Sequence, residues 1–316
     1  MKPLPLLFNP RSGPRGKDPD ALMRRLPPSL RARVEPQVFE APYDFEPAIA
    51  QAVAAEGPLL VWGGDGTIHH AGRALLAAGC PVALGAIPGG SGNGLVRGLR
   101  TPLEPAGAVQ RLLEGRELAM DVGFLDGEPF LNLCGTGFEA TVAHAFESGR
   151  GRGFSGYART CLRLYRTERD LELGWEAELP AAADPASRSG RLREAWRGEA
   201  AGPPPRAWSL CFAVLPQYGS GLWIAPGADP TDGVLSWVRL HRPGPLDLLT
   251  ALPALFREGG RTHLREEGHL LRARLVLDRS MPWHMDGEAV APRDRAELAV
   301  RPRAFRMQVT SACPWR

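Results

Sequence analysis

The sequence predicts a two-domain protein of the α/β plus β class, with a Rossmann-like N-terminal domain followed by a mainly antiparallel β-sandwich domain. Over the first third of the chain, short apolar runs alternate with helix-length segments, which is typical of parallel β-α-β units. After about residue 118 the pattern changes to short strands separated by turns, which favours antiparallel pairing. A chain of 316 residues is long enough to bury a core in each of two domains.

The first predicted domain, residues 1–118, is expected to alternate strands and helices. Its strands are expected at 5–9, at 33–41, at 58–64 and in the first part of 80–93. Its helices are expected at 18–30, 44–57, 68–78 and 105–116. An aspartate near the start of the first helix and a glycine at the end of the second are the usual helix boundary signals.

The second predicted domain, residues 119–302, is expected to be rich in β-strands. The segment 118–143 should hold short strands around an Asp-Gly turn, and a helix is expected at about 155–169. The polar segment 180–206 is expected to be a long surface loop. Further strands are expected at 207–216, 234–240, 272–278 and 306–311. The terminal strand, about 303–316, either returns to the first domain or closes the second.

Composition is that of a soluble globular protein, with 44% apolar and 23% charged residues. The formal net charge of +3 is too small to indicate nucleic-acid binding. The 5 cysteines are scattered and lack C-x-x-C spacing, so neither disulfides nor a zinc site is expected. No apolar run is long enough for a membrane span, and the N-terminal run is too short for a signal peptide. We therefore expect a cytoplasmic protein.

Two glycine clusters follow successive predicted strands, Gly-Gly-Asp-Gly-Thr at 63–67 and Pro-Gly-Gly-Ser-Gly-Asn-Gly at 88–94. Open α/β sheets bind ligands at the carboxyl ends of their strands, and glycines there let backbone N–H groups approach a phosphate. Ordinary tight turns are the alternative, and neither cluster matches a Walker A or dinucleotide-binding motif. Asp65 would repel phosphates unless it holds a divalent cation or orients the attacking group.

The order of these clusters resembles the catalytic domain of the diacylglycerol kinase family, which includes bacterial lipid kinases and sphingosine kinases. Residues 6–13, LLFNPRSG, resemble the opening N-P-x-S-G segment of that family. Residues 130–142 resemble its F-x-N-x-x-G-x-G-x-D-A segment, and 225–238 its A-P-x-A-x-x-x-D-G-x-L block. Residues 284–290, HMDGEAV, resemble its late D-G-E motif. The resemblance covers most of the chain and implies the fold of NAD kinases and diacylglycerol kinases.

The resemblance implies an enzyme that uses ATP and Mg²⁺ to phosphorylate a lipid hydroxyl, of diacylglycerol, a sphingoid base or a related lipid. Glu288 would be the general base, and Asp65 would act with Mg²⁺ or with the acceptor hydroxyl. Asp232 would anchor a structural Mg²⁺ site with backbone carbonyl groups near Asp229 and Val234. The residues expected to hold the nucleotide are Asn9, Ser12, Gly13, Gly63, Gly64, Asp65, Gly66, Thr67, Gly90, Ser91, Gly92 and Asn93.

The sequence departs from the family pattern at three places. His69 and His70 stand where the family often has Asn-Glu, Gly94 stands where it often has aspartate, and no threonine follows the second strand. Two alternatives therefore stay open: a catalytically weak lipid-binding or regulatory member, and an NAD kinase-like small-molecule kinase. The second should lack the blocks at 230–235 and 286–288.

The partners expected are a lipid substrate and, transiently, the inner face of the membrane, with no nucleic acid; a homodimer is left open. Residues 148–169 are basic, with aromatic and leucine side chains interleaved. This pattern fits contact with an anionic membrane surface, and it equally fits a helix with a solvated arginine face.

Overall fold

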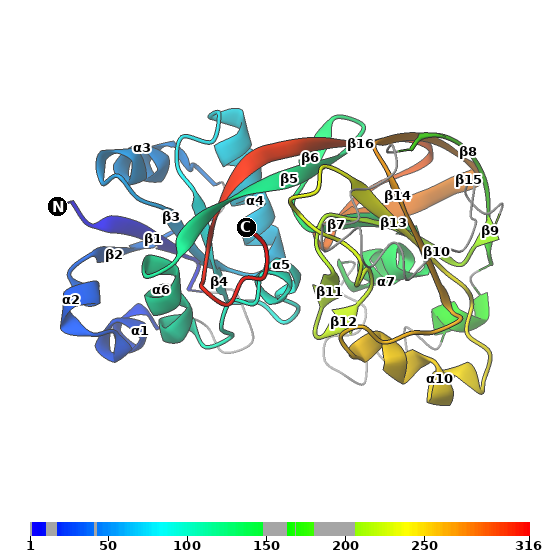
Figure 1. Cartoon of the computed structure of the whole chain (residues 1–316), viewed down its shortest axis with the longest axis horizontal. Helices are drawn as coiled ribbons and strands as arrows, with labels where there is room; N and C mark the ends of the chain where they lie inside the picture. Colours follow the sequence, from blue (N-terminus) through cyan, green and yellow to red (C-terminus); the bar gives the residue numbers. More distant parts are fainter. Residues whose placement is uncertain (1, 11–17, 41–42, 148–162, 168, 180–205) are drawn as a thin grey trace. The chain divides into compact units, whose positions relative to one another are not determined.

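The structure, a computed structural model, describes residues 2–10, 18–40, 43–147, 163–167, 169–179 and 206–316 (Figure 1). The chain divides into two compact units. The first unit comprises Met1–Asp121, Gln217–Gly221 and Arg303–Arg316. The second comprises Val122–Pro216 and Leu222–Pro302. The first domain predicted from the sequence ended at residue 118 and did not include residues 217–221.

The first unit is built on a parallel sheet in the order β2-β1-β3-β4. Its strands are β1 (Leu4–Phe8), β2 (Val34–Val38), β3 (Leu59–Gly63) and β4 (Leu84–Pro88). Every residue of β1, β3 and β4 is buried, as expected for strands that helices cover on both faces. The parallel α/β class predicted for this part of the chain is therefore confirmed.

Helices cover both faces of this sheet (Figure 1). They are α1 (Pro19–Arg25), α2 (Pro28–Arg31), α3 (Glu46–Ala54), α4 (Asp65–Ala77), α5 (Gly94–Gly98) and α6 (Pro105–Leu113). One core cluster joins the sheet to α1 and α6: Leu6, Phe8, Leu22, Leu26, Val34, Leu60, Trp62, Ile87, Ala106, Ala108, Val109 and Leu112. In Figure 1, α3 and α4 lie on the opposite side of the sheet.

Two helix boundaries in the first unit differ from the prediction. The helix predicted at 18–30 is wrong as a single element: Asp18 caps α1 by accepting from Ala21 N at 2.9 Å, but α1 ends at Arg25. The chain then meets Pro27 and Pro28, and proline disfavours helical geometry in the residue before it. The helix predicted at 68–78 begins three residues earlier, at Asp65.

The second unit contains a mainly antiparallel sheet in the order β14-β13-β10-β7-β15-β16, which confirms the β-rich class predicted for it. The strands outside the parallel sheet are β5 (Arg116–Leu125), β6 (Glu128–Phe130), β7 (Leu133–Gly137), β8 (Leu171–Glu178), β9 (Arg206–Ala207), β10 (Ser209–Ala213), β11 (Gln217–Gly219), β12 (Leu222–Trp223), β13 (Leu235–Leu240), β14 (Arg265–Leu270), β15 (Arg272–Met285) and β16 (Glu288–Val309). The far end of β16 belongs to the first unit, where Met307 pairs with Leu84 of β4 in parallel register.

Helical segments interrupt the second unit where the sequence predicted none. Short strands were predicted throughout 118–143, which is wrong for its last residues, because α7 (Phe138–Glu147) follows β7 directly. A short helix α10 (Asp247–Thr250) and a 3-10 helix η1 (Leu252–Phe256) lie between β13 and β14. Most of the predicted helix at 155–169 and of the predicted loop at 180–206 lies outside the described residues. In the described part of the chain, no helix has the length and apolar character needed to span a bilayer.

Two Asp-Gly hairpins organise the second unit. Asp126 and Gly127 have positive φ angles of 50° and 83° and connect β5 to β6, where Leu125 pairs with Glu128. Asp286 and Gly287 have φ angles of 50° and 90° and connect β15 to β16, where Met285 pairs with Glu288. Two-residue loops with both φ angles positive are type I′ turns, for which Asp-Gly is a preferred sequence. The antiparallel turn predicted in 118–143 is thus confirmed.

Candidate functional site

The two glycine clusters of the first unit pack against each other, backbone to backbone. A Cβ atom built on Gly90 would lie 2.7 Å from the Cα of Gly64, and one on Gly92 would lie 2.9 Å from Oδ2 of Asp65. Within the first cluster, a Cβ on Gly63 would lie 2.5 Å from the Cβ of Thr67. Because real side chains do not tolerate these distances, the glycines are needed for the mutual approach of the loops as well as for access to the backbone.

Asp65 binds the first glycine loop to the second. It is the first residue of α4, and its Oδ2 and Oδ1 atoms accept hydrogen bonds from Asn93 N at 2.9 Å and from Gly94 N at 2.7 Å. Hydrogen bonds to an ionised acceptor are shorter and stronger than neutral ones. The sequence made Asp65 unexpected here because a carboxylate repels phosphates. The N–H groups of Asn93 and Gly94 offset part of its negative charge.

Asn93 closes the second glycine loop on itself. Its Oδ1 accepts from Gly90 N at 2.9 Å, and its Nδ2 donates to Gly90 O at 2.8 Å. The residue has a positive φ of 51°, a left-handed conformation that asparagine tolerates better than most residues. Asn93 is only 8% exposed, so its contribution to this site is to shape the loop.

A third segment, residues 217–221, packs against the second glycine loop and was missed by the sequence reasoning. Ser220 N donates to Gly92 O at 2.9 Å, and Ser220 Oγ donates to Ser91 O at 3.4 Å. Gly219 has a φ of 144°, and a Cβ atom there would lie 3.2 Å from the Cα of Gly92. The Gly-Ser-Gly sequence at 219–221 was the only local signal for this contact.

The histidines after the first glycine loop have different environments. His69 is 4% exposed, whereas His70 is exposed, with its ring centroid 5.4 Å from that of Tyr43. Tyr43 in turn stacks on Phe39 at 5.1 Å. An aromatic cluster therefore occupies the region after β2 where the family pattern has a threonine. Of the opening motif, Asn9 follows β1 and is partly exposed, while Ser12 and Gly13 lie outside the described residues.

In the second unit, Asp286 fixes the hairpin that carries Glu288. Its carboxylate accepts hydrogen bonds from three successive backbone N–H groups, those of Leu131, Asn132 and Leu133, at 2.9, 2.8 and 3.1 Å. Asp286 is 6% exposed, so these bonds form out of water, where an unpaired N–H group is costly. Glu288 is the first residue of β16 and is partly exposed.

Asp229 and Asp232 lie in one loop of the second unit and offer the oxygen ligands that Mg²⁺ prefers. Asp229 Oδ1 accepts from the N–H and hydroxyl of Thr231, at 2.9 and 2.7 Å, and Asp232 Oδ1 accepts from Val234 N at 3.1 Å. No group of three or more His, Cys, Asp or Glu side chains able to hold a metal occurs among the described residues. A cation here would depend on backbone carbonyl groups and water for its other ligands.

Glu267 supports the same loop from the neighbouring strand. Burial raises its pKa to about 7, although the charge of Arg265 and a hydrogen bond with Gly227 oppose the shift. Arg265 Nε lies 2.5 Å from Glu267 Oε1, and its other guanidinium nitrogens donate to Trp223 O at 2.9 Å and Gly260 O at 2.7 Å. The sequence reasoning missed this buried pair, because it lies outside the family motifs.

Glu267→Gln is expected to remove part of the pH dependence of stability. With a pKa raised from 4.5 to about 7, the folded protein keeps a proton that the unfolded chain releases. The resulting stabilisation is complete below the ordinary pKa and is lost as the pH rises through about 7, a change of roughly 3 kcal/mol. Urea denaturation at a series of pH values should show a smaller fall in unfolding free energy for the variant over this range.

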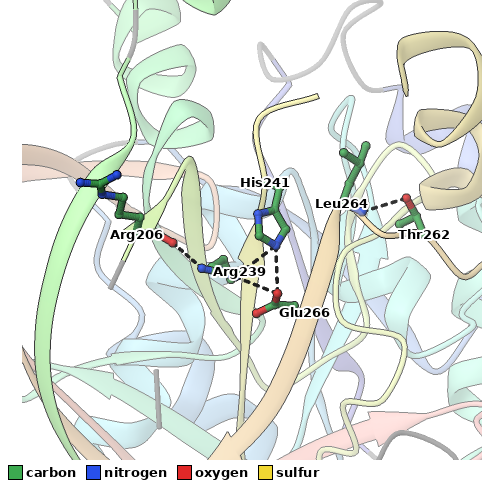
Figure 2. Close-up of polar contacts among 6 residues, drawn as sticks. All are labelled: Arg206, Arg239, His241, Thr262, Leu264 and Glu266. Carbon is green, nitrogen blue, oxygen red and sulfur yellow. Dashed lines mark hydrogen bonds and ion pairs between the residues drawn. The ribbon is translucent and has the colours of Figure 1, made fainter. Parts of the chain in front are cut away.

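Glu266→Gln is the matched control for this measurement, because it should change the pH dependence in the opposite sense. Burial opposes the shift, but hydrogen bonds from Arg239 and His241 lower the pKa of Glu266 below 4.5 (Figure 2). Its stabilisation is therefore present above that pH and lost as the pH falls. If Glu267→Gln leaves the pH profile unchanged, Glu267 is ionised throughout and paired with Arg265.

Two family models match separate parts of the chain. The diacylglycerol kinase catalytic domain matches residues 3–125, and the YegS C-terminal NAD kinase beta sandwich-like domain matches residues 201–309. A protein of Pseudomonas fluorescens named "Probable lipid kinase YegS-like" is 29% identical over 273 residues, 86% of this chain and 84% of its own. A diacylglycerol kinase of Mycobacterium tuberculosis is 26% identical over 279 residues, 84% and 81% of the two chains.

Solved structures share the fold. The crystal structure of a diacylglycerol kinase from Bacillus anthracis str. Sterne matches with a TM-score of 0.66 at 15% identity, covering 99% of this chain and 98% of its own. Another structure from the same organism matches with a TM-score of 0.70 at 17% identity and the same coverage. At these identities the match supports the fold alone.

Proposed function

The chain belongs to the diacylglycerol kinase catalytic-domain family, and from this premise we propose that it is an ATP-dependent lipid kinase. The observation that carries the proposal is the pair of glycine loops at the carboxyl edge of the parallel sheet, held together by Asp65. Relatives named lipid kinase and diacylglycerol kinase support a lipid hydroxyl as acceptor. Diacylglycerol, sphingoid bases and related lipids are the acceptors to test.

The nucleotide phosphates would lie along the two loops. Residues 63–67 include the start of α4, whose first N–H groups have no partner within the helix and favour negative charge. Residues 90–93 supply a second turn of backbone, and Asn9 follows the adjacent strand β1. We assign Asp65 a role beside the phosphates, with Mg²⁺ or the acceptor hydroxyl, in addition to its contacts with Asn93 and Gly94.

Glu288 would act as the general base. In the proposed step its carboxylate takes the proton of the lipid hydroxyl while the hydroxyl oxygen bonds to the γ-phosphorus of ATP. The bond from the γ-phosphorus to the bridging oxygen breaks, and ADP leaves with that electron pair. The Asp286 hairpin would keep the carboxylate of Glu288 oriented. Catalysis of this kind depends mainly on positioning and charge.

Mg²⁺ would be held by Asp232 with backbone carbonyl groups near Asp229 and Val234, and a second site could involve Asp65. When bound near the phosphates, Mg²⁺ neutralises negative charge that develops during transfer. This assignment is supported by the carboxylate and backbone carbonyl oxygens of the loop, which are the ligands that Mg²⁺ prefers.

A catalytically weak lipid-binding member is the second candidate. It is favoured by one observation: His70 and Gly94 replace acids that the family often has, and His70 packs beside Tyr43 at the first glycine loop. The loss of these acids changes the charge beside the proposed phosphate site.

Glu288→Gln tests the proposed kinase, with Glu128→Gln as a matched control. Both glutamates directly follow an Asp-Gly type I′ turn and open a strand, so the substitution is the same in both hairpins. We expect transfer of the labelled γ-phosphate from ATP to lipid to fall about 100-fold or more in Glu288→Gln, because the proton acceptor is lost. Glu128→Gln should retain activity.

The assay would present diacylglycerol, sphingosine and phosphatidylglycerol in detergent micelles, with and without MgCl₂. Absence of turnover with every lipid, together with retained lipid binding, would favour the catalytically weak member. Turnover that survives Glu288→Gln would show that another group accepts the proton.

A further inference from the structure

Residues 242–263 form an excursion from the sheet of the second unit, between β13 and β14. Its two ends are fixed to each other: His241 N donates to Leu264 O at 2.8 Å. At the same point Glu266 Oε1 accepts from Arg239 at 2.7 Å and contacts His241 Nε2 at 3.0 Å (Figure 2). Arg239 also donates to Arg206 O at 2.7 Å, which links the strand before the excursion to β9. The first and last residues of the excursion are therefore held together by hydrogen bonds between β13 and β14.

The excursion is also bonded internally. Asp247 accepts from Gly244 N at 2.7 Å, and its Oδ1 lies 2.9 Å from His263 Nε2. Ala251 and Leu255 point inward, with exposures of 7% and 4%. These contacts hold α10 and η1 as ordered elements with one covered side and one open side.

Three large apolar side chains of the excursion are exposed. Leu246 is 76% exposed, Leu249 is 77% exposed and Phe256 is 53% exposed. The two leucines are the most exposed of the large apolar side chains in the described chain. Because Leu246 and Leu249 are three residues apart at α10, they project from the same side of the helix. Clustered exposure of this kind marks an interaction surface more often than isolated apolar residues do.

Exposed arginines accompany these apolar side chains in the excursion and in the helical residues that contact it. Arg242 and Arg257 are exposed within the excursion. The helical residues 163–167 lie against it, because Tyr165 Oη donates to Pro243 O at 2.6 Å and the Arg242 guanidinium lies 5.0 Å from the Tyr165 ring centroid. Residues 163–167 and 242–263 together contain five arginines, Arg163, Arg166, Arg242, Arg257 and Arg261. They contain two acids, Asp247 and Glu258. The surface is therefore both apolar and positively charged.

We propose that the open side of residues 242–263 docks on an anionic lipid bilayer. Leu246, Leu249 and Phe256 enter the boundary between headgroups and acyl chains, and the exposed arginines contact lipid phosphates. Apolar anchors beside basic side chains are the pattern by which peripheral proteins bind anionic membranes. The proposal rests on the proposed function, because a lipid kinase must take its substrate from a bilayer. It is the positive charge that favours a phospholipid surface over an apolar protein partner.

The double variant Leu246→Ser/Leu249→Ser tests this surface in the full chain. We expect its binding to vesicles of phosphatidylcholine and phosphatidylglycerol, measured by co-sedimentation, to weaken about 10-fold or more, because two apolar anchors are lost. Leu103→Ser/Val276→Ser removes two side chains of comparable type, 46% and 51% exposed elsewhere, and should bind as the wild type does. Arg166→Gln/Arg257→Gln should weaken binding to these vesicles but not the weaker binding to pure phosphatidylcholine.

Activity separates this proposal from the proposed function. The leucine variant should phosphorylate a soluble short-chain diacylglycerol as the wild type does, and should lose activity only on lipid embedded in vesicles. If the wild type phosphorylates no lipid, the kinase proposal fails while vesicle binding still decides the docking surface. Unchanged vesicle binding by the leucine variant would overturn the docking proposal. So would a wild-type dimer that the variant converts to monomer without any loss of vesicle binding, since a second copy would then cover the surface.

Discussion

Asp286→Ala is expected to lower the free energy of unfolding by about 4 kcal/mol, measured by urea denaturation. The substitution removes the single carboxylate that accepts three backbone N–H groups, those of Leu131, Asn132 and Leu133. Each hydrogen bond to a charged group contributes roughly 1.5–3 kcal/mol, and each buried N–H left without an acceptor carries a penalty of its own. Partial entry of water would recover some of this loss. The segment before β7 should therefore loosen, and Glu288, two residues beyond Asp286, should lose its fixed position.

Asp126→Ala is the control for this prediction. Asp126 occupies the same position in the other Asp-Gly hairpin and has the same φ angle of 50°. Its carboxylate is on the surface, where it accepts from Glu297 N at 2.7 Å and pairs with Arg293. Surface contacts of this kind contribute about 1 kcal/mol or less. Equal destabilisation by the two variants would mean that the loss of stability comes from the turn conformation and not from the buried carboxylate of Asp286.

The fold class could be predicted because it depends on patterns that are local in the sequence. The apolar runs that became β1, β3 and β4 are continuous, and their burial on both faces is what such runs indicate. The errors have local physical causes. Proline at 27 and 28 ended a helix that periodicity extended to residue 30. The glycines at 63–66 resembled a loop, although an acidic residue such as Asp65 is favoured in the first turn of a helix.

The geometry around the predicted site residues could not be predicted from the sequence, because it depends on contacts between distant residues. The motifs predicted Asp65 as a catalytic and nucleotide-binding residue, but they gave no reason to expect its hydrogen bonds with the backbone of residues 93 and 94. The approach of residues 217–221 to Gly92 joins segments more than a hundred positions apart. The raised pKa of Glu267 follows from burial beside Arg265, and burial of an acid cannot be seen in its sequence neighbours. These features arise from tertiary packing.

Asp65→Asn is expected to lower kcat/KM for ATP about 1000-fold, and the way the loss divides tests the two roles given to Asp65. Asparagine keeps one acceptor oxygen but places an NH₂ group where the second N–H donor lies, so the clamp on Asn93 and Gly94 weakens. We expect this change to raise the KM for ATP about 10-fold. The lost charge beside the cation or the acceptor hydroxyl should lower kcat about 100-fold.

Gly90→Ala isolates the first of these effects. It leaves the Asp65 carboxylate intact, but its Cβ would lie 2.7 Å from the Cα of Gly64, so the two loops must move apart. We expect a raised KM for ATP with a smaller change in kcat. Gly174→Ala is the control, because its Cβ would meet nothing closer than Val276 O at 3.9 Å. If Asp65→Asn raises KM as Gly90→Ala does and leaves kcat unchanged, Asp65 is a clamp between the loops and takes no part in phosphoryl transfer. A fall in kcat confined to Asp65→Asn would instead place the charge of Asp65 beside the cation or the acceptor hydroxyl, because both variants disturb the loop geometry and only Asp65→Asn removes the charge.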